Sequence, residues 1–224
     1  MMTNGHLQTQ LGSTVIIFPA VGRNKRPHQV SENLQVVLSA NSITTRYNQI
    51  TKRPELLIPD LRCVKDESHN TSLTVATDLA IKAGMTANRI PELLDAIAAQ
   101  NPYCPVQTYI DSKPWDGVSR FAQFTGQIVC TNSTFTDFLW RKWLIQAVAA
   151  AYEQRGIANA GMIVLTGNQN VGKTTFFSAM TTGIEGAFLE GQTLNPADKD
   201  SVLSAVSHWI VELGELDSTF KKAD

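Results

Sequence analysis

Residues 167–174 read GNQNVGKT and match the phosphate-binding signature G-x-x-x-x-G-K-[ST]. In such a loop, backbone N–H groups and the positive end of the next helix bind phosphate oxygens. We expect Lys173 to reach the β- and γ-phosphates of a nucleoside triphosphate, and the Thr174 hydroxyl to ligate magnesium. The expected nucleotide-binding residues are Gly167, Asn168, Gln169, Asn170, Val171, Gly172, Lys173, Thr174 and Thr175. A chance match has a probability under about 1% in a chain of this length.

Hydrolysis requires a carboxylate at the end of a second strand, to hold the metal and to orient the attacking water. Residues 209–213 read WIVEL and predict a buried strand downstream of the loop. Glu212 lies within this strand, and we expect it to bind magnesium together with Thr174. Glu215 follows the strand, and we expect it to act in catalysis with Lys173 by orienting the water. The alternative for each carboxylate is a solvated residue at the edge of the sheet.

The segments around the loop predict an α/β domain. Residues 162–166 (MIVLT) form a continuous apolar run, which is typical of a strand buried on both faces. A helix is expected at 173–180, a short strand at 187–189, and a helix at 196–206 with Asn195 as its cap. With the acidic strand last, this order predicts a parallel sheet with right-handed crossovers.

The upstream region has mainly helical patterns. Helices are expected at 31–40 with Ser31 as cap, 72–83, 88–100 and 134–152, a small hairpin at 46–58, and an irregular connection at 101–118. In the last helix, we expect one set of apolar residues to be buried against other helices: Phe135, Phe138, Leu139, Ile145, Val148 and Ala149. Trp115, in the irregular connection, is expected to pack onto the helical layer.

Composition limits the class of protein. The chain has 224 residues, 43% hydrophobic and 17% charged, which is enough apolar material for a buried core. Its net charge of -1 argues against a protein that is basic throughout, although it allows local basic patches. The three cysteines are far apart, which disfavours a zinc or disulfide framework. Without an apolar run of about 18 residues, no membrane span is expected.

Together these patterns predict three regions. Residues 1–30 are expected to be a weakly structured tail, and 31–158 a mainly helical region with a minor β element. Residues 159–224 are expected to be a P-loop ATPase domain. We expect only the N-terminal half of its parallel sheet, so that the domain is incomplete at its C-terminus.

Several stretches together resemble the virulence-associated protein E family of phages and mobile elements, which is related to superfamily 3 and AAA+ helicases. They are residues 101–120 (NPYCPVQTYIDSKPWDGVSR), 141–149 (RKWLIQAVA), 162–177 (MIVLTGNQNVGKTTFF), 199–201 (KDS) and 208–217 (HWIVELGELD). The resemblance implies ATP and Mg²⁺ as cofactors and the cytoplasm of a bacterial host as location. For the complete protein it implies single-stranded DNA and a homo-oligomeric ring as partners, and no membrane.

The resemblance implies the ATP-binding and ATP-hydrolysing portion of a DNA replication helicase or primase-associated protein. Family members continue beyond the second acidic motif, whereas this sequence stops at Asp224. We therefore expect either a fragment or a truncated gene product, with weak nucleotide binding and negligible DNA-stimulated turnover. The alternative is a non-catalytic nucleotide-binding or interaction protein left by truncation. A small-molecule phosphotransferase would need lid and acceptor residues that the sequence does not show.

Overall fold

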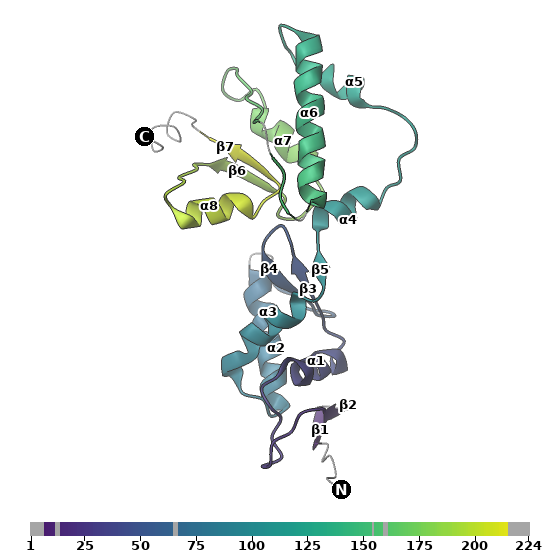
Figure 1. The fold of residues 1–224 in the computed structure, drawn as a ribbon, viewed down its shortest axis with the longest axis vertical. Coiled ribbons are helices and arrows are strands. Elements are labelled where there is room, and N and C mark those ends of the chain that lie inside the picture. The colour runs from purple at the N-terminus through teal and green to yellow at the C-terminus, as the bar shows by residue number, and fades with distance from the viewer. Residues whose placement is uncertain (1–6, 12–13, 65–66, 154, 159–160, 215–224) are drawn as a thin grey trace. The chain divides into compact units, whose positions relative to one another are not determined.

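The structure is a computed structural model that describes residues 7–11, 14–64, 67–153, 155–158 and 161–214. The chain divides into two compact units, Met1–Tyr103 and Cys104–Asp224 (Figure 1). Both units combine helices with small sheets, so the protein is of mixed α/β class. The sequence predicted a boundary after residue 158, whereas the structure divides after Tyr103.

The first unit has two small sheets and a group of helices. Its described elements are β1 (Leu7–Leu11), β2 (Thr14–Phe18), α1 (Ser31–Ala40), β3 (Thr44–Asn48), β4 (Arg53–Leu57), α2 (Ser68–Lys82), the 3₁₀ helix η2 (Ala87–Arg89), α3 (Ile90–Ala98) and β5 (Pro102–Tyr103). β1 and β2 pair antiparallel, with Leu7 opposite Phe18. β3 pairs antiparallel with β4 and parallel with β5, so the second sheet has the order β4-β3-β5.

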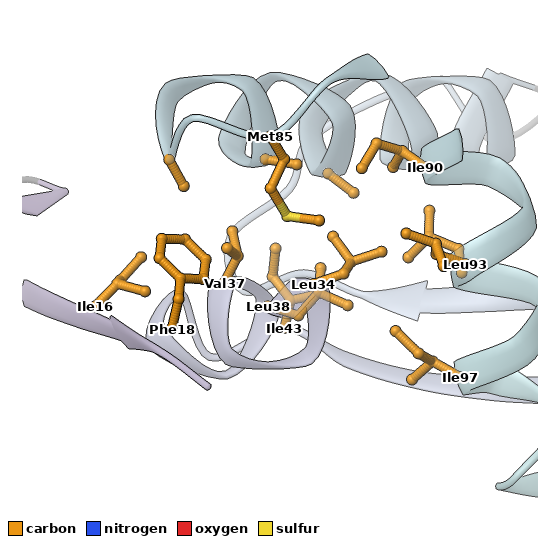
Figure 2. Packing of buried hydrophobic residues seen from close by; sticks show 14 residues of the cluster. Ile16, Phe18, Leu34, Val37, Leu38, Ile43, Met85, Ile90, Leu93 and Ile97 are labelled. Carbon is orange, nitrogen blue, oxygen red and sulfur yellow. The ribbon is translucent and has the colours of Figure 1, made fainter. Parts of the chain in front are cut away.

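β2 contributes to the core of the first unit, which differs from the expected weakly structured tail. Ile16 and Phe18 are 1% and 0% exposed, whereas Val15 and Ile17 between them are 55% and 47% exposed. This alternation is the period of a strand that has one buried face. Figure 2 shows Ile16 and Phe18 beside apolar side chains of the helices. The segment is ordered because its apolar residues face one side and find a helical layer to cover them.

The helical predictions for this unit are largely confirmed. α1 has the predicted bounds, but its N-cap is Val30 and Ser31 makes no cap hydrogen bond. α3 has Pro91 in its first turn, where the missing N–H costs nothing. The predicted hairpin is formed by β3 and β4, and Lys52 in its turn has a φ of 58°.

The second unit contains the predicted phosphate loop. Its described elements are α4 (Pro105–Asp111), α5 (Phe121–Thr125), α6 (Ser133–Tyr152), α7 (Lys173–Met180), β6 (Phe188–Gln192), α8 (Lys199–Val206) and β7 (Ile210–Leu213). β6 and β7 are parallel and connected through α8, which confirms this strand–helix–strand order. α8 begins later than predicted, because Asp198 caps it and Asn195 holds a separate turn by accepting from the Ala197 N–H.

The strand predicted at 162–166 is not formed. This segment has no regular secondary structure, and Met162 and Val164 are 57% and 54% exposed. The described sheet of this unit therefore has two strands rather than three. A continuous apolar run predicts burial, but a strand also needs a neighbour to accept its hydrogen bonds. No described residue supplies that ladder to 162–166.

The predicted buried face of α6 is also wrong. Phe135, Phe138 and Ile145 are 57%, 51% and 62% exposed, whereas Trp140 is 2% exposed. α6 carries apolar residues around much of its circumference, so periodicity alone does not choose a face. The inner face is the one that meets the aromatic residues of α5 and α7. Trp115 does not pack onto a helix: it is 79% exposed, and its indole N–H donates to the Val118 carbonyl.

Candidate nucleotide-binding site

The loop at 167–172 has a backbone that glycine and asparagine adopt most readily. Asn170 has a φ of 62°, and Gly172, the N-cap of α7, has a φ of 86°. A side chain added at Gly172 would meet no atom within 4 Å, so glycine is needed for the backbone angle and not for space. The loop is exposed throughout, and α7 begins at Lys173. The N–H groups of the first turn of α7 therefore lie next to a free loop, as anion binding requires.

Lys173 folds back over the loop that precedes it. Its ammonium group donates to the carbonyl oxygens of Gly167 and Asn168, each at 2.8 Å. These bonds hold the positive charge across the loop, although the carbonyl partners are uncharged. A phosphate oxygen is a stronger partner for an ammonium group than a carbonyl oxygen is. The geometry thus leaves Lys173 able to exchange these bonds for contacts with a phosphate.

Thr174 and Glu212 are brought together although they lie far apart in the sequence. The Thr174 hydroxyl donates to Oε1 of Glu212 at 2.6 Å, and both residues are half-buried. Thr174 is in the first turn of α7 and Glu212 is in β7, and these two elements contact one another. A hydroxyl and a carboxylate are the hard oxygen ligands that Mg²⁺ prefers. The two residues predicted to bind magnesium therefore lie next to each other at one site.

A cavity of about 350 Å³ lies beside this pair. Its lining is mainly apolar, and Lys173 and Glu212 are its charged members. The lining residues are Trp143, Met162, Ile163, Val164, Leu165, Lys173, Phe177, Ile210, Val211, Glu212, Leu213 and Gly214. The cavity thus lies between β7 and the segment 162–165, which was predicted to be part of a strand.

An aromatic cluster that was not predicted from the sequence positions α7. Phe176 and Phe177 lie 5.6 and 6.0 Å from the Trp140 ring, measured between centroids. Phe124 and Trp143 lie 5.3 and 5.5 Å from the same ring. Such pairs add stability beyond the burial of their area. The signal in the sequence was the aromatic pair that directly follows the phosphate signature.

The structure gives less information on the contacts of the remaining predicted site residues. Gln169, Val171 and Thr175 are exposed. Glu215, the predicted water-orienting residue, lies outside the described residues. Its position relative to Lys173 therefore stays a prediction.

The site lies within a recognisable domain. A family model described as the virulence-associated protein E-like domain matches residues 110–224. The chain belongs to this family. The match includes the phosphate loop, α7 and β7, and thus every residue of the candidate site. No curated protein matches the sequence.

Membership of the virulence-associated protein E-like family suggests a protein associated with phages or other mobile elements. The matched range also contains the exposed Trp115, whose neighbours Asp116 and Arg120 form an ion pair. The hydrogen bonds from Arg120 lower the pKa of the Asp116 carboxyl.

Of the helices that the structure describes, none is long and apolar enough to cross a membrane.

Proposed function

We propose that this protein binds ATP·Mg²⁺ at the loop 167–174. In this proposal it is the ATP-binding and ATP-hydrolysing portion of a phage or mobile-element DNA replication protein, of the helicase or primase-associated kind. The observation that carries the proposal is the hydrogen bond between Thr174 and Glu212. It supports a metal site at the start of the helix that follows a complete phosphate signature, as P-loop enzymes require.

Each residue has a defined task in this proposal. The N–H groups of residues 168–174 bind phosphate oxygens, and Lys173 leaves its two carbonyl partners to contact the β- and γ-phosphates. Thr174 and Glu212 would hold the magnesium ion, which when bound neutralises charge on the phosphates. Glu215 orients the water that attacks the γ-phosphorus. The parallel strands β6 and β7 are proposed to be part of a P-loop sheet.

Binding is tested by calorimetry with ATP·Mg²⁺ on the wild-type chain and on Lys173→Ala. Each charge-assisted hydrogen bond contributes about 1.5–3 kcal/mol, so loss of one such contact weakens binding about 10- to 150-fold. Lys142→Ala is the matched control, because Lys142 is an exposed lysine in the same unit that contacts the Phe138 ring. Equal affinities for wild type and Lys173→Ala would refute the assignment of this loop.

The metal site is tested separately. Thr174→Val removes the hydroxyl and Glu212→Gln removes the charge, so both variants should lose most of the Mg²⁺ dependence of ATP binding. Both should keep the metal-independent part, because Lys173 and the loop amides are unchanged. Phosphate release, measured with and without single-stranded DNA, distinguishes an ATPase from the non-catalytic nucleotide-binding alternative. Binding without turnover would favour that alternative.

A further inference from the structure

The segment between β2 and α1 concentrates positive charge. Arg23, Lys25 and Arg26 lie within four residues, and residues 1–31 contain no aspartate or glutamate. All three side chains are exposed, and none forms an ion pair or side-chain hydrogen bond with another described residue. We call residues 23–26 the basic loop. It lies in the dark purple segment between β2 and α1 in Figure 1.

A buried asparagine holds the base of the basic loop. Asn33, on α1, is 0% exposed. Its Oδ1 accepts from the N–H of Ala20 at 3.1 Å, and its Nδ2 donates to the carbonyls of Ala20 and His28 at 2.6 and 2.9 Å. The N–H of His28 also donates to the Ala20 carbonyl at 3.0 Å. The two ends of the segment are thereby tied to each other and to the core helix.

The basic loop itself is a closed turn. The N–H of Gly22 donates to the Arg26 carbonyl, and the N–H of Lys25 donates to the Gly22 carbonyl, each at 2.9 Å. Val21 and Pro27 form a bridge beneath the turn. Because its backbone bonds are already made, the turn loses little backbone entropy when it contacts a partner. The three cations are thus presented on a preformed support.

A neighbouring segment adds one more cation. The backbone carbonyl of Gln29 accepts a hydrogen bond from the guanidinium of Arg89 at 3.3 Å. The side-chain Oε1 of Gln29 accepts a hydrogen bond from the N–H of Thr86. These bonds place η2 next to the stem of the basic loop. Arg89 is partly offset by Glu92 at 3.5 Å, so the uncompensated charge is that of the loop.

We propose that the basic loop is a contact surface for the phosphate backbone of duplex DNA. Exposed cations on a preformed turn, without carboxylate partners among the described residues, suit phosphate contacts. Residues 19–30 contain no Phe, Tyr or Trp, so the imidazole of His28 is the one ring there on which a base of a single strand could stack, and successive bases would find no stacking platform. A membrane surface fits less well, because Pro27 is buried and Val21 is half-buried, so neither of the apolar residues paired beneath the turn is free to insert. The contact is independent of sequence, because phosphates carry no base information.

The test uses the full chain, a fluorescent 20-base-pair duplex and a series of salt concentrations, without nucleotide. The variant Arg23→Gln/Lys25→Gln removes two loop charges. Each phosphate contact contributes about 0.9 to the slope of log K against log salt, so the slope should fall by about 1.8. At 0.1 M salt this corresponds to about 60-fold weaker binding. The charge-matched control is Lys52→Gln/Arg53→Gln, which removes two exposed cations from the β3–β4 turn and should keep the slope.

The conservative variant Arg23→Lys/Lys25→Arg should bind as the wild type does, and circular dichroism should show all variants folded. The proposal is overturned if the wild type does not bind the duplex, or if the loop variant keeps its slope. It is also overturned if the control loses as much affinity, since the attraction would then be general. Loop-dependent binding to phosphatidylserine vesicles, with DNA binding unchanged by the loop variant, would assign the surface to a membrane instead. ATP binding is measured on the same samples, so failure here is distinguishable from failure of the nucleotide site.

Discussion

Asn33 is expected to be a buried polar side chain on which the stability of the first unit depends strongly. It makes three hydrogen bonds at 0% exposure, and each such bond contributes about 0.5–1.5 kcal/mol. Asn33→Ala therefore loses about 1.5–4.5 kcal/mol. The higher helix propensity of alanine returns about 0.6 kcal/mol. The expected net loss of unfolding free energy is about 2 kcal/mol, which corresponds to about a 30-fold change in the unfolding equilibrium.

The assay must report on the first unit alone. All four tryptophans lie beyond Tyr103, so tryptophan emission does not follow this unit. Hydrogen exchange with mass spectrometry does, because amides of α1 that exchange through unfolding should exchange about 30-fold faster in Asn33→Ala. Peptides from α6 and α7 should be unchanged.

The matched control is Asn41→Ala at the end of the same helix. Asn41 makes one side-chain hydrogen bond, to the Val37 carbonyl at 2.8 Å, and is half-buried. Its loss should cost about 0.5–1 kcal/mol. If both variants exchange equally fast in α1, the triple hydrogen bond does not hold this segment, and the reasoning about the basic-loop stem is refuted.

Three further predictions concern the second unit. Glu215→Gln should retain ATP binding and lower phosphate release about 100-fold, the scale for loss of a group that activates the nucleophile; unchanged turnover would remove that role. Trp140→Ala should lower the unfolding free energy by about 3–5 kcal/mol in urea titrations, whereas Phe138→Ala on the exposed side of the same helix should cost under about 1 kcal/mol. Because Arg120 lowers the pKa of Asp116, their interaction is complete above the ordinary value of 3.8 and is lost as pH falls through the lowered one. A carboxyl NMR titration of Asp116 giving 3.8 or higher would contradict this.

The phosphate signature shows how much local sequence decides. The glycine at 172 and the following lysine and threonine fix a loop that enters a helix, because only glycine adopts the required angle without strain and α7 starts next to it. The strand–helix–strand order of β6, α8 and β7 likewise follows from apolar runs and a cap. These features depend on residues close together in the chain, and the sequence predicted their order.

Pairing across long separations was not predictable with the same certainty. The hydrogen bond between Thr174 and Glu212 joins residues 38 positions apart. The sequence suggested both as metal ligands, but only the packing of α7 on β7 brings them within 2.6 Å. By contrast, the strand expected at 162–166 had the right composition and no partner. Whether a strand forms depends on a neighbouring strand that pairs with its backbone as much as on its own residues.

The tertiary structure alone decided which face of α6 is buried. α6 offers apolar residues on more than one side, and the aromatic residues of α5 and α7 select the Trp140 side. The same holds for Asn33, which in the sequence is one of several polar residues of α1. Only the fold shows that its amide faces the two ends of the basic-loop segment. The sequence by itself therefore determined most of the local elements and which residues are candidates for phosphate binding, because propensity, capping and turn chemistry are local. Which surfaces meet depends on complementary groups from distant segments, and only the tertiary structure decided that.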